Sequence, residues 1–86
     1  MSASLRSVLG QSIRARRAEL QMTQQVLAQR VGVSQSCIAN IEAGRRAADL
    51  DILARIAAAL RTTASALLSA DPTFGGATRD AEATSR

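Results

Sequence analysis

Apolar residues recur every three to four positions along most of this chain, which is the spacing of an α-helix that buries one face. In the first segment, roughly residues 4–20, these positions are Leu5, Leu9, Ile13 and Leu20. Arginines occupy the other faces of the segment. We therefore expect an amphipathic first helix with a basic outer face.

Two shorter helices are predicted over residues 23–30 and 35–43, with a turn between them at residues 31–33. Thr23 and Ser34 have short side-chain oxygens that can accept hydrogen bonds from the first turn of a helix, so each is a predicted N-cap. Gly32 supplies the sharp turn between the helices. The positions expected to face a shared core are Leu27, Ala28, Val31, Val33, Ile38 and Ile41.

The second of these helices then has an outward face that is small, polar and uncharged. It consists of Gln35, Ser36, Ala39 and Asn40. Such a face has the character of a surface that contacts DNA bases. With the turn before it, the segment predicts a DNA-binding helix-turn-helix over residues 23–44.

The rest of the chain continues the helical pattern and then loses it. Asp49 can cap a fourth helix, in which apolar residues recur at Leu50, Leu53, Ile56, Ala57 and Leu60. Thr62 or Thr63 can cap a short fifth helix that ends near Leu68. No alternating β-branched stretch appears, so the fold class is all-α, with one domain over residues 1–70.

From residue 71 the sequence contains Pro72, Gly75 and Gly76 and almost no apolar side chains. We expect this tail, residues 71–86, to be disordered or to order only against a partner. Phe74 is its one aromatic residue. The alternatives for Phe74 are simple exposure, which is the commoner outcome, or packing on the last helix or on a second subunit.

Charge is unevenly distributed along the chain. Residues 1–70 hold nine arginines against Glu19, Glu42, Asp49 and Asp51, a net charge of +5, whereas the tail carries −1. A basic domain of this kind favours a polyanionic partner, although many small basic domains bind no anion specifically.

Several classes of function are excluded by composition. With one cysteine and no histidine, the chain has neither an internal disulfide nor a His/Cys metal cluster nor a Ser-His-Asp arrangement. We therefore expect no enzyme activity, no catalytic residues, no metal and no cofactor. The chain also lacks a long apolar run and the ordered charges of a secretory signal, so we expect no membrane association and a cytoplasmic location.

Residues 9–68 resemble the phage-repressor and Cro-like (XRE-like) helix-turn-helix family. The family pattern appears here as Thr23-Gln24, Leu27-Ala28, Gly32-Val33-Ser34, Ile38, Ile41-Glu42 and Gly44-Arg45-Arg46. The resemblance implies a five-helix, lambda-repressor-like domain. It also implies that the second helix of the motif enters the major groove of double-stranded DNA and meets base edges with its first residues.

Carried over by position, the resemblance implies that Gln35, Ser36 and Asn40 contact bases. A glutamine or asparagine amide can pair with N6 and N7 of adenine. It further implies phosphate contacts, which set affinity rather than sequence choice, from Gln24, Arg14, Arg45 and Arg46. Gln24 can also brace Gln35, the first glutamine of the second helix of the motif, which is the recognition helix. The alternative is that these polar residues are only solvated helix surface.

Five further residues follow from the same resemblance or qualify it. Arg17 and Glu42 match a family pair that forms a structural ion pair between the first helix and the recognition helix. Gln21 and Arg61 stand where the family usually has residues that tolerate a left-handed backbone, so each costs about 1 kcal/mol if that conformation is needed. Cys37 is either a small space-filling side chain, which we favour, or a redox switch beside the base contacts.

The predicted function is a sequence-specific transcription regulator, a homodimeric repressor that binds an inverted repeat. The expected dimer interface is the last helix, at Ala66, Leu67 and Leu68, because no later element covers it. Two alternatives remain open. The chain could be the antitoxin of a toxin–antitoxin pair, with the tail binding a toxin protein, or a restriction–modification controller.

Overall fold

The chain folds into five helices and no strand over residues 4–68, which are the residues that the computed structural model describes. The helices are α1 (Leu5–Glu19), α2 (Gln24–Val31), α3 (Gln35–Glu42), α4 (Leu50–Ala59) and α5 (Ala64–Leu67). The predicted all-α fold is confirmed, and each predicted boundary lies within a few residues of the observed one. The predicted tail, with Phe74 and any toxin-binding segment, lies outside the described residues.

Each helix begins at a residue whose side-chain oxygen accepts a hydrogen bond from the backbone N–H three residues later. The five N-caps are Ser4, Thr23, Ser34, Asp49 and Thr63. The donor–acceptor distances run from 2.8 to 3.1 Å. Capping explains why the helix starts could be predicted so closely, since each capped N–H would otherwise lack a partner.

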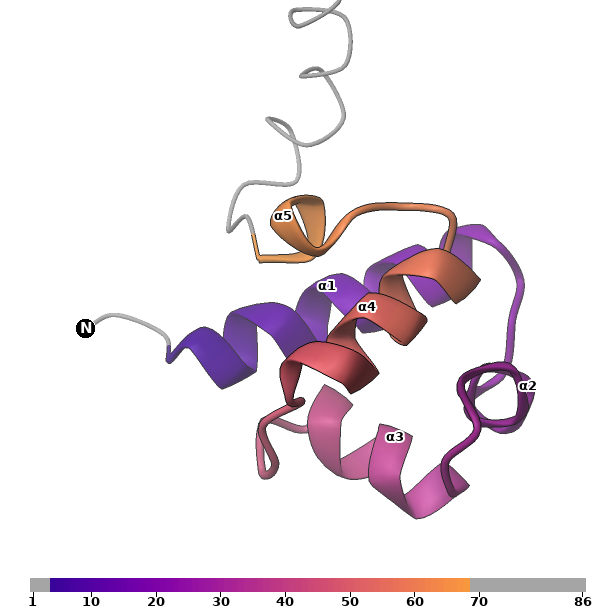
Figure 1. Cartoon of the computed structure of the whole chain (residues 1–86), viewed down its shortest axis with the longest axis horizontal. Coiled ribbons are helices and arrows are strands. Elements are labelled where there is room, and N and C mark those ends of the chain that lie inside the picture. The colour runs from indigo at the N-terminus through magenta and orange to yellow at the C-terminus, as the bar shows by residue number, and fades with distance from the viewer. Residues whose placement is uncertain (1–3, 69–86) are drawn as a thin grey trace, which may run out of the picture.

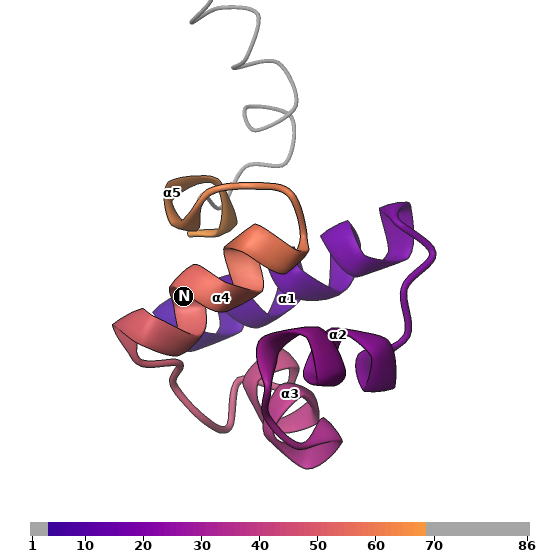
Figure 2. The same cartoon turned by 45° about the vertical axis from the view of Figure 1, so that its right-hand side comes forward.

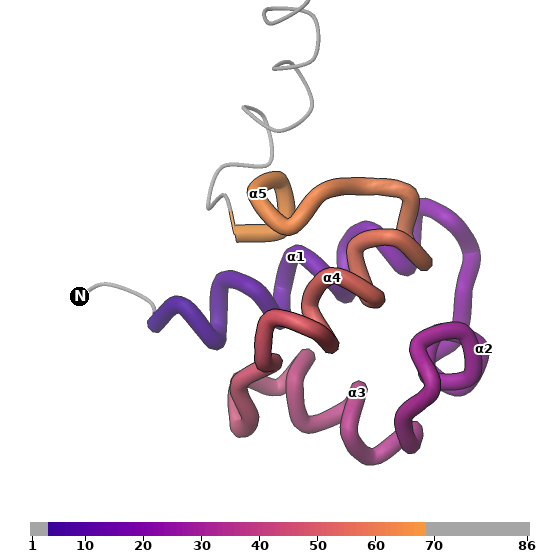
Figure 3. Tube along the Cα trace, viewed as in Figure 1, coloured from indigo at the N-terminus to yellow at the C-terminus, as the bar shows by residue number. Residues whose placement is uncertain are grey.

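Helices α1 and α4 occupy the middle of the molecule, with α5 on one side of them and α2 and α3 on the other (Figures 1 and 2). The tube in Figure 3 shows α4 following α3 through a loop at the end of the molecule where α1 begins. The side chains buried between the helices are Leu9, Ile13, Leu27, Ala28, Val31, Cys37, Ile38, Ile41, Leu53, Ile56, Ala57, Leu60 and Leu67.

Two leucines that the apolar periodicity assigned to the core are on the surface. Leu5 is 64% exposed and Leu50 is 84% exposed. Each is the first residue after its helix's N-cap. The periodic pattern is correct for both helices, but their first turns extend beyond the neighbours that cover later positions.

The predicted dimer interface needs a similar correction. Leu67 is only 3% exposed and belongs to the chain's own core, so the interpretation that it lacks cover is wrong. Helix α5 packs against both α1 and α4, and these earlier helices bury it. Ala66 is exposed and Leu68 is half-buried, so these two positions remain accessible.

Gln21 and Arg61 both adopt the left-handed backbone conformation, with φ of 55° and 57°. At both positions the family that the sequence resembles usually has residues that tolerate this conformation. The turn at Arg61 is stabilised by Arg16, whose Nε donates to the Leu60 carbonyl at 2.9 Å and whose Nη2 donates to the Arg61 carbonyl at 3.2 Å. Arg16 therefore supplies hydrogen bonds that the end of α4 would otherwise lack.

Helix α1 passes close to the backbone of α3 at Gly10. A Cβ placed there would lie 2.6 Å from the Ile41 carbonyl oxygen and closer still to that of Glu42. Only a residue without a side chain fits between the two backbones. This contact fixes the position of the C-terminal end of α3 against the first helix.

Candidate nucleic-acid interface

The two helices of the predicted motif are joined by a tight turn. Gly32 ends α2 in the left-handed conformation, with φ of 86°. The N–H groups of Gly32 and Val33 both donate to the Ala28 carbonyl, at 2.8 and 3.0 Å. Arg55 of α4 also donates to the Val31 carbonyl at 3.4 Å. The turn thus holds α3 at a set angle to α2.

Helix α3 presents one apolar face inward and one polar face outward. Cys37, Ile38 and Ile41 are buried. Gln35 and Ser36 are exposed at the N-terminal end, and Asn40 is half-buried one turn later. In Figures 1 and 2, α3 lies at the edge of the molecule, on the side away from α5. The outward face is therefore open to a long, rod-shaped partner such as a DNA duplex.

Gln35 is connected to the interior by hydrogen bonds. Its Nε2 donates to Oε1 of Gln24 at 3.5 Å, and Nε2 of Gln24 donates to Oε1 of Glu42 at 3.1 Å. The predicted bracing of Gln35 by Gln24 thus appears in the structure. The bond from Gln24 to Glu42 was not foreseen, and the phosphate contact of Gln24 remains a prediction.

Glu42 also forms a two-point ion pair with Arg17. Arg17 Nε donates to Oε2 at 2.7 Å and Nη2 donates to Oε1 at 3.0 Å, while Nη1 donates to the Met22 carbonyl at 2.8 Å. The side chains of Arg17 and Glu42 are 16% and 4% exposed. The hydrogen bond that Arg17 donates to Glu42 raises the pKa of Arg17 further above its ordinary value, against the opposing effect of burial.

Six of the nine arginines within residues 4–68 fall into two groups. Arg16, Arg17 and Arg55 bond to other parts of the chain. The predicted phosphate contacts Arg14, Arg45 and Arg46 have exposed side chains. Backbone N–H groups of Arg45 and Arg46 donate to the Asn40 carbonyl at 2.9 and 3.3 Å, which places both residues directly after the recognition helix.

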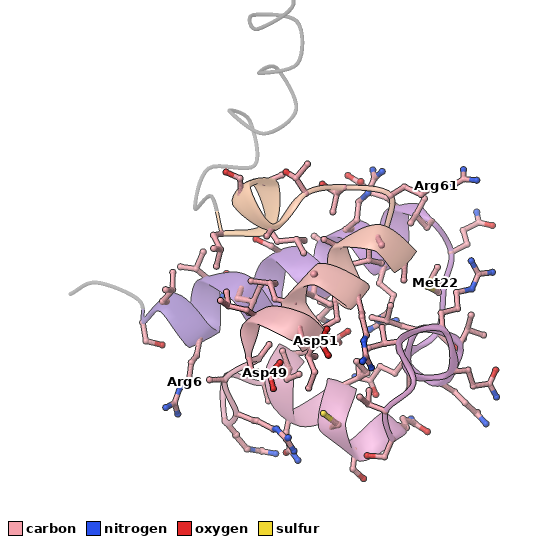
Figure 4. The ribbon with its side chains drawn as sticks, viewed as in Figure 1. Arg6, Met22, Asp49, Asp51 and Arg61 are labelled. Carbon is pink, nitrogen blue, oxygen red and sulfur yellow. The ribbon has the colours of Figure 1, made fainter. Side chains whose placement is uncertain are left out.

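Arg6 is another exposed arginine on the side of the molecule where α3 lies. Figure 4 shows Arg6, at the start of α1, on the side of the molecule where α3 lies, whereas Arg61 lies on the opposite side, just after the end of α4. Sequence reasoning did not single out Arg6 because a first-turn residue of α1 is distant from α3 along the chain. The packing of α1 against α3 brings that end of α1 to this side.

Cys37 is 7% exposed and packs in the core of the motif. This position favours the space-filling interpretation over the redox switch. Within residues 4–68, no group of three or more His, Cys, Asp or Glu side chains is placed to hold a metal ion. None of the helices in that part of the chain combines the length and hydropathy that a membrane-spanning helix requires.

In the comparison with protein families, a helix-turn-helix family model matches residues 13–67. The matched segment begins within α1 and ends within α5, so it includes both helices of the motif and the buried residues that support them. No curated protein matches the sequence significantly.

Solved structures resemble the chain over most of its length. The clp gene regulator ClgR from Corynebacterium glutamicum has a TM-score of 0.79 and 26% identity, over 100% of this chain and 92% of its own. The restriction–modification controller protein C.AhdI from Aeromonas hydrophila has a TM-score of 0.69 and 26% identity, over 74% and 96%. The hypothetical transcription factor NHTF from Neisseria has a TM-score of 0.75 and 30% identity, over 81% and 79%.

Proposed function

Because the chain belongs to the XRE-like helix-turn-helix family of DNA-binding transcription regulators, we propose that it is a homodimeric repressor that binds an inverted DNA repeat through α3. The proposed action is binding alone, without a catalytic step or a cofactor. We place it in the cytoplasm, with the DNA that it regulates.

The observation that supports this proposal best is the position of Gln35. It is exposed at the first turn of α3, and Gln24 holds its amide from the neighbouring helix. A glutamine amide that is both exposed and oriented is suited to a two-point contact with adenine in the major groove. Ser36 and Asn40 lie on the same face and complete the proposed set of base contacts.

Dimerisation is proposed because one motif contacts only a few base pairs. Two copies related by a two-fold axis would place their α3 helices about 34 Å apart, which is one turn of DNA. Ala66 and Leu68 remain in the proposed interface, whereas Leu67 is excluded from it by its burial.

Selection of bound sequences from random DNA tests the proposal. For the wild-type chain we expect an enriched inverted repeat, and for Gln35→Ala we expect relaxed preference at one position of each half-site. The cost for each site contact is about 1–3 kcal/mol. If the wild-type chain enriched no motif, or if Gln35→Ala selected the same motif as strongly, the proposed role of α3 would be wrong.

The exposed arginines yield a separate prediction about affinity. Arg45→Gln is expected to weaken binding by a similar factor for every DNA sequence. The fall of log affinity with log salt should become less steep, by about 1 in slope. Arg61→Gln is the matched control, since it removes the same charge on the opposite side of the molecule. Equal salt slopes for the wild-type and Arg45→Gln chains would exclude a phosphate contact by Arg45.

One alternative has support from a particular comparison. The similarity to C.AhdI favours a restriction–modification controller, which is also a DNA-binding regulator. The two proposals share the same interface and differ in the genes controlled. A bound sequence located next to restriction and methyltransferase genes would favour the controller.

A further inference from the structure

We propose that Arg6, in the first turn of α1, binds the phosphate backbone of DNA together with Arg45 and Arg46. The start of the first helix is then part of the DNA interface. This inference rests on the proposed function, because it concerns the same duplex. It adds a contact from outside the segment that the family model matches, which begins at residue 13.

The first turn of α1 lies against the loop that follows α3. A Cβ placed on Gly44 would lie 3.2 Å from Oγ and 3.5 Å from Cα of Ser7, so the two backbones are in contact there. Gly44 has a φ of 77°, a conformation that glycine adopts without strain. Arg6 and Arg45 are each one residue from this contact. Their long side chains can therefore reach the same stretch of a DNA backbone from two different segments of the chain.

The direction of the Arg6 side chain agrees with this arrangement. Arg6 is exposed, as are Arg45 and Arg46. Figure 4 shows the Arg6 side chain extending from α1 toward the side of the molecule where α3 lies. The outward face of α3, with the proposed base contacts, is on that side. A duplex bound by α3 would thus have Arg6 beside it rather than behind the protein.

The positive charge of Arg6 is not neutralised within residues 4–68. The ion pairs among these residues are Arg16–Glu19, Arg17–Glu42 and Arg55–Asp51. Their remaining carboxylate, Asp49, accepts the capping hydrogen bond of α4 at 2.8 Å. Three positive charges near the C-terminal end of α3, on Arg6, Arg45 and Arg46, thus lack an acidic partner in the part of the chain that the structure describes.

A DNA phosphate is the partner that these charges fit. Duplex DNA carries closely spaced negative charge along both strands, and an arginine side chain can donate two parallel hydrogen bonds to one phosphate. The major groove is only just wide enough for a helix, so the strands that border it pass close to α3. Such contacts increase affinity and fix the position of the protein, but they do not select bases.

The first test is the salt dependence of DNA binding by an Arg6→Gln chain. Between about 50 and 200 mM salt, each phosphate contact accounts for a loss of affinity of about threefold. The advantage of the wild-type chain over Arg6→Gln should therefore shrink by about threefold for each bound subunit over this range. The same change is expected on the selected duplex and on random DNA, and Arg45→Gln should match it.

Arg61→Gln is the matched control, because it removes the same charge on the opposite side of the molecule and should leave the salt dependence as in the wild-type chain. Urea unfolding of Arg6→Gln provides a second control. Arg6 is exposed and glutamine favours helices about as well as arginine, so the stability of the fold should not change.

The second test locates the contact on the DNA. Ethylation of single phosphates in the selected duplex removes their charge one at a time, and the phosphates at which it weakens wild-type binding are those that the chain contacts. In Arg6→Gln we expect one of these phosphates in each half-site to lose its effect. It should be the phosphate that loses its effect in Arg45→Gln or one adjacent to it.

Three results would overturn the inference. They are a salt dependence of Arg6→Gln equal to that of the wild-type chain, an unchanged set of sensitive phosphates, and a loss of stability that accounts for all of the weaker binding. Each is distinct from failure of the proposed function, in which the wild-type chain would enrich no motif or Gln35→Ala would keep the wild-type base preference. In that case the inference fails as well.

Discussion

Replacing Gly10 with alanine is expected to destabilise the fold by about 2–3 kcal/mol. The added methyl group would meet the backbone carbonyls of Ile41 and Glu42, the former at 2.6 Å. Backbone atoms in the middle of a packed domain cannot move aside as the end of a side chain can. Alanine also favours a helix interior over glycine by about 1 kcal/mol, but this gain is smaller than the cost of separating α1 from α3.

Urea unfolding of the full chain, followed by circular dichroism, measures this effect. Gln11→Ala is the matched control, because Gln11 is the next residue of α1 and is exposed; its stability should be close to that of the wild-type chain. A Gly10→Ala chain at least as stable as the wild type would show that helix propensity outweighs the contact. The packing of α1 on α3 described above would then be wrong.

Loss of either member of the Arg17–Glu42 pair is expected to cost about 3–5 kcal/mol, because the remaining charge stays buried without its partner. The pair is 16% and 4% exposed and joined by two hydrogen bonds. The double replacement, Arg17→Met with Glu42→Leu, should cost much less than the sum of the single changes. Removing both charges also removes the energetic cost of burying them.

Thermal and urea unfolding of the two single variants and the double variant form a double-mutant cycle that measures this coupling. Asp51→Asn is the control, since the Asp51–Arg55 pair is 71% and 51% exposed and exposed pairs contribute at most about 1 kcal/mol. Additive losses at Arg17 and Glu42 would mean that the two residues act independently. Their ion pair would then not connect α1 to α3.

The local features of the fold were predictable from the sequence because they depend on neighbouring residues. A hydroxyl or carboxylate at Thr23, Ser34 and Asp49 satisfies N–H groups only three residues away, and each caps its helix in the structure. Likewise, the apolar spacing within α3 determines which of its side chains turn outward, and Gln35 and Ser36 are exposed as expected.

The features that could not be predicted from the sequence depend on contacts between segments that are far apart along the chain. Gly10 could not be recognised as a contact point, since nothing near it in the sequence reveals that α3 ends against it. Leu67 was assigned to a dimer interface because it is close to the end of the domain, but α1 and α4 cover it. Arg16 was counted as surface charge, although it bonds to carbonyls 44 and 45 residues away.

In the candidate site too, the sequence predicted individual residues, whereas the connection between them depends on how the helices pack. The resemblance to a known family supplied the bracing of Gln35 by Gln24 and, as a separate feature, the Arg17–Glu42 pair. The structure shows that they form one chain of hydrogen bonds through the Glu42 carboxylate. That chain depends on the angle between α2 and α3, which the sequence alone does not give.

The central claim is that α3 contacts the bases of DNA. The most direct measurement is an NMR titration of the full chain with its selected duplex, following the side-chain amide signals of Gln35 and Asn40. We predict that both signals shift markedly and show contacts to base protons in the major groove. If the duplex bound tightly while both amides stayed unperturbed and the shifts fell on α5 instead, the account would be contradicted.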